Sequence, residues 1–229
     1  MKDLLGHRAT EKQIQKGEFK MYENSFTDVR DKIYYRLVNT ELNRVMIDAC
    51  PSVELTEIGV SKIYFIYLGE DSFGIRDLFV TNQISEAFNL SVEVLDACSE
   101  RNTARLFPTI SEPMYDIIER MEEKGIEEAK GIKLEIPFYL LTNRNREYGG
   151  SAMFDKAFLN GFGEALNQEQ LYILGISEHE SLIVLGNDMN DITKLTEAFH
   201  GIQAAMEDEK LTDKIIVYNV KARMYSVVA

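Results

Sequence analysis

Residues 171–185 read LYILGISEHESLIVL, and this stretch decides the architecture of the C-terminal half of the chain. Two apolar runs, residues 171–176 and 181–185, flank the polar residues Ser177-Glu178-His179-Glu180. Short apolar runs bounded by polar residues are typical of buried strands, and a short polar loop between them allows a hairpin. The stretch therefore predicts two antiparallel strands joined by a turn.

Strand and helix patterns alternate on either side of this hairpin. Residues 133–141 favour a strand and residues 151–166 a helix, while residues 214–220 and 224–228 favour two final strands. A long helix follows the hairpin, with one apolar face made of Ile192, Leu195, Phe199, Ile202 and Met206. This order is β-α-β-β-α-β with an extra C-terminal strand, which is the split β-α-β or ferredoxin-like pattern.

Right-handed crossovers in such a pattern predict the strand order 4-1-3-2, with both helices on one face of an antiparallel sheet. Leu195 and Phe199 should then be buried against that sheet. The same topology brings the loop after Leu141 and the turn at residues 177–180 to one end of the sheet, and places residues 187–191 at the other end.

The N-terminal half combines strands with helices. β-branched and aromatic residues favour strands at 32–38, 53–58, 62–68 and 73–80. Helical spacing favours helices at 41–49, after Ser91, and after Ser111 with Pro113 in its first turn. We expect an α+β fold in three parts: a flexible segment at 1–24, antiparallel strands with helices at 25–130, and the split β-α-β part at 131–229.

Composition excludes several classes of function. The formal net charge of −13 disfavours nucleic acid as a partner. No apolar run approaches the roughly 20 residues that cross a bilayer, so we expect a cytoplasmic protein without a membrane partner. Cys50 and Cys98 lack the spacing of a disulfide framework or a zinc site, and we expect buried thiols and no cofactor.

One short motif is similar to a known catalytic box. Gly186-Asn187-Asp188-Met189-Asn190-Asp191 resembles the GDxxND box of haloacid-dehalogenase-like phosphatases, whose acidic pair binds Mg²⁺. That family also needs a nucleophilic aspartate in a DxD motif, and the sequence has no DxD triplet. A helix cap at Asp188 or Asn190 explains the same letters, so a Mg²⁺-dependent phosphohydrolase using Asp188 and Asp191 is the alternative function.

A broader resemblance covers nearly everything after Phe26. Three segments carry it: YRLVNTELN, VTNQISEAFNLSVEVLDACSERNTARLFP, and YLLTNRNREYGGSAMF followed by LYILGISEHESLIVL. They resemble a bacterial family of unknown function, which implies a related fold but no activity, cofactor or catalytic residue. Since the three histidines His7, His179 and His200 stand apart in sequence, we expect a non-enzymatic binding or regulatory module.

One loop has the features of an anion site. Residues 142–151 read TNRNREYGGS, a locally basic stretch that leads into a predicted helix N-terminus. Backbone N–H groups and guanidinium groups both favour anions at such a position. The sequence therefore predicts a small-anion site, and the residues that would form it are Arg144, Arg146, Gly149, Gly150, Ser151 and, from the hairpin turn, His179. The alternative is an ordinary strand-to-helix loop, with the arginines paired to Glu147 or Glu180.

Overall fold

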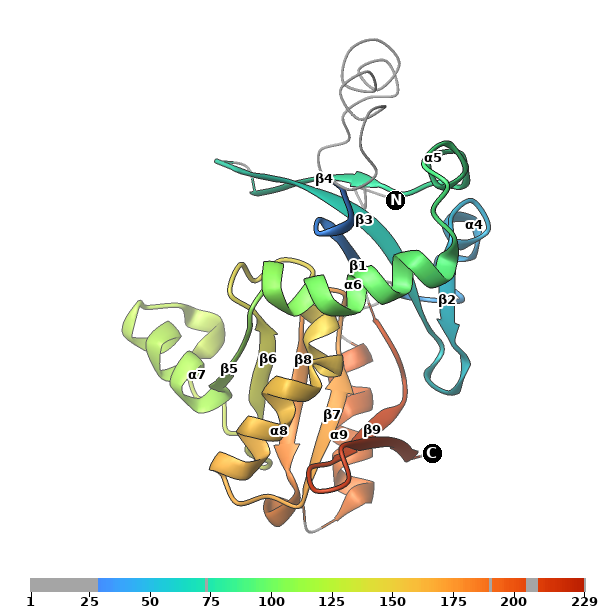
Figure 1. The fold of residues 1–229 in the computed structure, drawn as a ribbon. Helices are drawn as coiled ribbons and strands as arrows, with labels where there is room; N and C mark the ends of the chain where they lie inside the picture. Colours follow the sequence, from blue (N-terminus) through green and yellow to red (C-terminus); the bar gives the residue numbers. More distant parts are fainter. Residues whose placement is uncertain (1–28, 73, 190, 205–209, 229) are drawn as a thin grey trace. The chain divides into compact units, whose positions relative to one another are not determined.

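The computed structural model describes residues 29–72, 74–189, 191–204 and 210–228 (Figure 1). The predicted flexible segment 1–24 and the predicted helix residue Met206 lie outside these residues. The chain forms two compact units, each assembled from separate stretches. The first unit comprises Met1–Tyr35, Val45–Val53 and Ile63–Leu106, and the second comprises Arg36–Arg44, Glu54–Lys62 and Phe107–Ala229. The sequence-based division lay at 130/131, whereas the second unit also includes residues 107–130.

The N-terminal half contains a four-stranded sheet made of the four predicted strands. These are β1 (Ile33–Asn39), β3 (Val60–Asp71) and β2 (Ser52–Leu55), in that spatial order, with β4 (Gly74–Phe79) antiparallel to β3. The 3-10 turn η2 (Thr56–Ile58) leads from β2 to Gly59, whose φ of +66° closes the turn before β3. Glycine adopts this left-handed conformation without the steric cost of a Cβ atom.

The same half of the chain contains three helices: α4 (Arg44–Ile47), α5 (Asn82–Ala87) and α6 (Val92–Leu106). In the first unit, α6 is fixed to the start of β1 by the Asn102 amide, which donates to the carbonyl oxygens of Arg30 and Ile33 at 2.7 and 2.9 Å. Leu95 and Cys98 on α6 are buried. Ser99, Asn102 and Thr103 are buried on the same helix, so tertiary contacts that include hydrogen bonds stabilise this element more than helix propensity does.

A six-stranded antiparallel sheet forms the body of the second unit. Its order is β10 (Met224–Val228), β9 (Ile215–Asn219), β7 (Gln170–Gly175), β8 (Ser181–Leu185), β6 (Tyr139–Asn143) and β5 (Thr109–Pro113). The predicted hairpin is confirmed, since β7 pairs with β8 in the register Leu171↔Leu185 to Gly175↔Ser181. The predicted extra C-terminal strand is also present, paired with β9.

The predicted order 4-1-3-2 is wrong. Numbering the strands β6, β7, β8 and β9 as 1 to 4, the observed order is 4-2-3-1, so β9 lies beside β7 and not beside β6. The reason is β5, which occupies the outer edge of β6 with the register Thr109↔Asn143 to Pro113↔Tyr139. Residues around Ser111 were predicted to open a helix; instead they form this strand, and α7 (Met114–Glu123) starts after Pro113.

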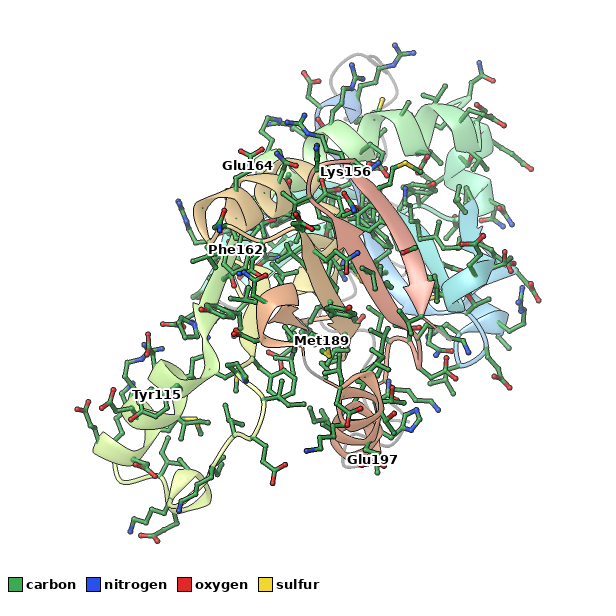
Figure 2. The ribbon with its side chains drawn as sticks, turned by 90° about the horizontal axis from the view of Figure 1, so that it is seen from below. Tyr115, Lys156, Phe162, Glu164, Met189 and Glu197 are labelled. Atoms are coloured by element: carbon green, nitrogen blue, oxygen red, sulfur yellow. The ribbon has the colours of Figure 1, made fainter. Side chains whose placement is uncertain are left out.

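The two helices of this half lie on opposite faces of the sheet, which corrects the expectation that they share one face. Figures 1 and 2 show α8 (Lys156–Ala165) on one side and α9 (Ile192–Ala204) on the other. Both crossovers, β6-α8-β7 and β8-α9-β9, run in the same direction across the sheet, while β6 and β8 point in opposite directions. Right-handed crossovers then place the helices on opposite faces.

The core under α9 is apolar and closely packed. Leu195 and Phe199 of α9 are fully buried in one cluster with Leu140, Leu174 and Val184 from three strands, so their predicted burial is confirmed. On the other face, the predicted helix 151–166 is divided into two parts. The buried 3-10 segment η4 (Gly149–Phe154) comes first, and α8 follows it, capped by Asp155, whose carboxylate accepts from the Phe158 N–H at 3.1 Å.

Two further short 3-10 elements occur in the second unit. They are η3 (Glu127–Ala129) after α7 and η5 (Gly186–Asp188) after β8.

In the described part of the chain, no helix combines the length and apolar character needed to cross a membrane.

Candidate functional site

The 142–151 loop and the β7–β8 turn meet at one end of the six-stranded sheet. The Thr142 hydroxyl donates to the His179 carbonyl oxygen at 2.8 Å, and the Gly150 N–H donates to the Glu178 carbonyl oxygen at 2.9 Å. The 142–151 loop begins at the end of β6 and the turn leads into its neighbour β8, so backbone groups of the two are within direct hydrogen-bonding reach. The structure thus brings the predicted residues of the loop and turn together.

Two buried glycines allow this close approach. A Cβ atom on Gly149 would lie 2.2 Å from the Thr142 hydroxyl oxygen and 2.7 Å from the His179 carbonyl oxygen. A Cβ atom on Gly150 would lie 2.8 Å from the Ser177 carbonyl oxygen. Real side chains do not tolerate such distances, so these positions need glycine for space.

The loop between the strand and these glycines carries backbone strain. Arg146 and Tyr148 have φ values of +57° and +53°, a region that non-glycine residues rarely adopt. The Arg146 N–H donates to the Asn143 carbonyl oxygen at 3.0 Å, and the Asn143 amide donates to the Glu147 carbonyl oxygen at 2.7 Å. Strain of this kind persists only where the surroundings hold the backbone, and it concentrates at functional sites.

Tyr148 is held by a cation and by a histidine. The guanidinium carbon of buried Arg36, on β1, lies 3.2 Å from the centre of the Tyr148 ring. The His179 ring is 5.1 Å from the same ring, and its Nδ1 accepts the Tyr148 N–H at 3.0 Å. In this hydrogen bond Nδ1 is the acceptor, which leaves Nε2 as the ring nitrogen that can donate.

The charges at this end of the sheet leave positive groups in excess around Glu112. Its carboxylate accepts from Arg120 at 2.6 Å and from Arg146 at 3.0 Å. Partial burial opposes ionisation, yet the hydrogen bonds from Arg146 and Arg120 hold the pKa of the Glu112 carboxyl below its ordinary value. Two guanidinium groups therefore share one carboxylate.

Arg144 adds a further cation to the 142–151 loop. Its backbone N–H donates to the Pro108 carbonyl oxygen at 2.9 Å, while its side chain is exposed and makes no hydrogen bond or ion pair with another described residue. The His179 side chain is also exposed, with Nε2 at 3.5 Å from a Glu178 carboxylate oxygen. Ser151 is buried within η4 and contributes no exposed hydroxyl.

The Gly186–Asp191 box lies at the opposite end of the sheet, where its polar groups bond locally. The Asn187 N–H donates to the Gln168 side-chain oxygen at 2.9 Å, and Asp191 caps α9 by accepting from the Thr193 N–H at 2.9 Å. Asn190 lies outside the described residues. Among the residues that the structure describes, no group of three or more His, Cys, Asp or Glu side chains could hold a metal ion.

The two cysteines are buried free thiols, as predicted. Burial raises the pKa of the Cys50 thiol to about 11, so this thiol stays protonated at neutral pH. A protonated thiol is neither a good nucleophile nor a metal ligand.

Sequence analysis missed two residues of the site. Arg36 lies in a strand far from the loop in the sequence, and nothing in the pattern of β1 links it to Tyr148. Glu112 was assigned to a helix, where it would not reach Arg146, but in β5 it pairs with Leu140 and faces the loop. Residues 109–113 have no apolar alternation, so no signal in the sequence identifies the strand that positions Glu112.

A family model matches residues 2–220 of the chain, and its description is "Family of unknown function (DUF5688)". The chain belongs to this family. The predicted resemblance to a family of unknown function is therefore confirmed. No curated protein and no solved structure matches this DUF5688 chain.

Proposed function

We propose that this DUF5688 chain is a non-enzymatic binding or regulatory module of the bacterial cytoplasm, which binds a small anion or an anionic group of a partner at the 142–151 loop. One observation carries the proposal: exposed Arg144 stands on a strained loop that also carries Arg146, which shares a single carboxylate with Arg120. Guanidinium groups favour carboxylate and phosphate ligands because they donate two parallel hydrogen bonds.

In this proposal the binding groups are the side chains of Arg144, Arg146 and His179. The Gly150 N–H is bound to the Glu178 carbonyl oxygen and does not serve the anion. The two glycines contribute instead by having no side chain, which leaves room for close packing. They let the loop pack on the β7–β8 turn and so hold the arginines in place. An anion competes with Glu112 for Arg146, and Glu112 therefore sets the affinity.

The experiment is an amide-resolved NMR titration of the full chain with inorganic phosphate and with sulfate. The amides of residues 144–153 and of His179 should shift more than any others at millimolar anion. Arg144→Ala should weaken binding at least fivefold, because it removes the uncommitted cation. Glu112→Gln should strengthen binding several-fold, because it removes the competing negative charge and leaves the side chain's size unchanged.

Lys194→Ala is the matched control, since Lys194 is an exposed cation on α9. It should leave anion affinity unchanged. Opposite signs for Arg144→Ala and Glu112→Gln are the signature of a local site, whereas equal weakening by Arg144→Ala and Lys194→Ala would show only a general effect of net charge. Shifts confined to other residues, or none at millimolar anion, would remove the proposal.

A further inference from the structure

A cavity of about 320 Å³ opens in the second unit, and none of the described residues that line it belongs to the 142–151 loop. One wall is formed by residues 54–58 of β2 and η2, and the other by residues 225–227 of the edge strand β10. Phe154 at the end of η4 and Ile216 on β9 complete the lining. This volume lies at the lower end of the range found for small-molecule pockets.

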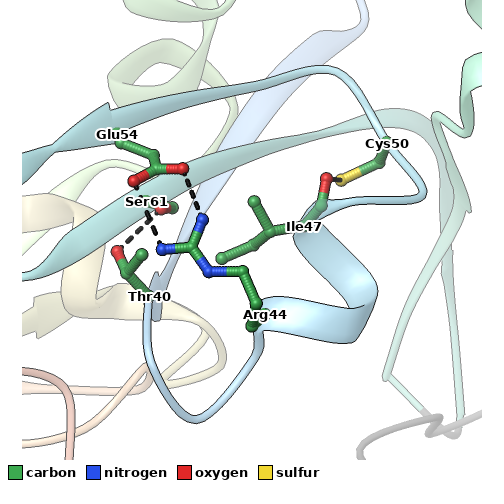
Figure 3. Close-up of polar contacts among 6 residues, drawn as sticks. All are labelled: Thr40, Arg44, Ile47, Cys50, Glu54 and Ser61. Atoms are coloured by element: carbon green, nitrogen blue, oxygen red, sulfur yellow. Dashed lines mark hydrogen bonds and ion pairs between the residues drawn. The ribbon is translucent and has the colours of Figure 1, made fainter.

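Hydrogen bonds inside the second unit hold these walls in place. The Thr212 hydroxyl donates to the Ile58 carbonyl oxygen at 2.6 Å, and the Asn39 amide donates to the Leu211 carbonyl oxygen at 3.2 Å. Arg44 binds both carboxylate oxygens of Glu54, at 2.7 and 3.5 Å (Figure 3). The η2 wall is therefore tied to the segment that precedes β9, and Glu54 already has a cation.

The lining is aromatic and apolar on the side of the sheet. The Phe154 and Tyr225 rings meet edge to face at 5.4 Å, and the Tyr225 ring also lies 5.0 Å from the Tyr218 ring. The ammonium group of Lys156 (labelled in Figure 2) lies 5.4 Å from the centre of the Tyr225 ring. This distance is within the range of a cation–π contact, so Lys156 and Tyr225 form such a pair beside the cavity.

Glu57 places a negative charge at the rim of the cavity. Glu57 is exposed at its rim and makes no hydrogen bond or ion pair with another described residue, in contrast to Glu54. No lysine or arginine belongs to the described lining, and the chain as a whole carries a net charge of −13. A ligand that combines a positive charge with an apolar group matches both features of this cavity.

We propose that this cavity binds a small organic cation, a primary amine attached to an aromatic or similar apolar group. Its ammonium group pairs with Glu57, and its apolar group packs against Phe154, Tyr225 and Val227. The proposal is independent of the anion site, because the two share no side chain.

Phenethylamine is the probe, with 2-phenylethanol and phenylacetate as neutral and anionic matches of nearly the same shape. In an NMR titration of the full chain, phenethylamine should shift the resonances of Glu57, Tyr225 and Val227. We expect 2-phenylethanol to bind at least fivefold more weakly and phenylacetate at least tenfold more weakly. Nα-acetyl-lysine methylamide, which carries the ammonium group without a ring, should bind at least fivefold more weakly than phenethylamine.

Glu57→Gln should weaken phenethylamine at least fivefold and leave 2-phenylethanol unchanged, because it removes the charge and retains the shape. Glu169→Gln is the control, since Glu169 is an exposed acid outside the cavity, and it should change neither ligand. Equal binding of phenethylamine and phenylacetate, equal binding of the lysine derivative, or no effect of Glu57→Gln would each overturn the proposal. A titration without shifts at millimolar phenethylamine would overturn it as well.

Discussion

The two ends of the six-stranded sheet use short polar loops in different ways. At one end, the 142–151 loop contains two non-glycine residues with positive φ, and the exposed side chain of Arg144 makes no hydrogen bond or ion pair with another described residue. At the other end, Asn187 and Asp191 are bound by their own neighbours, and none of the described residues between 186 and 191 has a positive φ. A polar motif indicates a functional site only where some of its side chains are not used in hydrogen bonds that stabilise the local fold.

The largest expected effect on the free energy of unfolding concerns α9, the helix that follows the Gly186–Asp191 box. If the box serves to start α9, its main consequence is the burial of Phe199, which is fully buried under the sheet. Phe199→Ala should lower the free energy of unfolding by about 3–5 kcal/mol, as is typical for an aromatic side chain removed from a core. Urea unfolding measures this, and a loss below about 1 kcal/mol would contradict the packing.

The second test concerns the glycines of the loop. Gly149→Ala should destabilise the protein by about 1–3 kcal/mol, because its Cβ atom would overlap the Thr142 hydroxyl and the His179 carbonyl group. Gly161→Ala is the control, since Gly161 lies within α8 with no atom within 4 Å of an added Cβ. It should stabilise the protein by about 0.5–1 kcal/mol. Similar effects of both changes in urea unfolding would contradict the close contact.

The third test asks whether Asp191 caps a helix or binds a metal ion. Asp191→Ala should cost about 1 kcal/mol, as the loss of an N-cap usually does. Thermal unfolding with and without millimolar Mg²⁺ separates the two roles, and the cap predicts the same midpoint in both conditions for the natural sequence. Stabilisation by Mg²⁺ that disappears in Asp191→Ala would instead support the phosphohydrolase alternative.

The smallest expected effect is the pH dependence of Glu112. Its pKa is lowered in the folded state, so its ion pairs contribute stability above the pKa of an unfolded glutamate, and this contribution is lost as the pH falls through the folded value. A carboxyl ¹³C titration should give a midpoint below the ordinary range, and Arg146→Ala should raise it. An ordinary midpoint in the natural sequence would contradict the shared ion pair. Because protonated Glu112 releases Arg146, anion affinity should also rise as the pH falls.

The strongly patterned parts of the fold could be predicted from the sequence. The β7–β8 hairpin and the apolar face of α9 follow from uninterrupted apolar runs and helical spacing, which report burial directly. β5 could not be predicted, because TISEP has no apolar alternation and all of its residues are half-buried. Once β5 was missed, the strand order and the faces of the two helices were also wrong, since one occupied edge redirects the remaining strands.

The candidate site could be predicted only where it depends on neighbouring strands. Since β6 and β7 end at the same side of the sheet, where β8 begins, the meeting of Gly149 and Gly150 with the β7–β8 turn was accessible from topology. The contact between Arg36 and Tyr148 was not, because a long-range cation–π pair leaves no periodic signal in either segment. The hydrogen bond from the Gly150 N–H to the Glu178 carbonyl oxygen also leaves no signal in the sequence.

The division of the chain into interleaved stretches has a consequence for its synthesis. Asn39 bonds to Leu211, 172 residues later, and Ile58 bonds to Thr212, 154 residues later. At synthesis rates of about 5–20 residues per second, these early segments wait roughly 10–30 s for their partners to leave the ribosome. The second unit can therefore be completed only after residues 211 and 212 have been synthesised. A nascent chain arrested before Leu211 should remain open to proteases within residues 36–44 and 54–62.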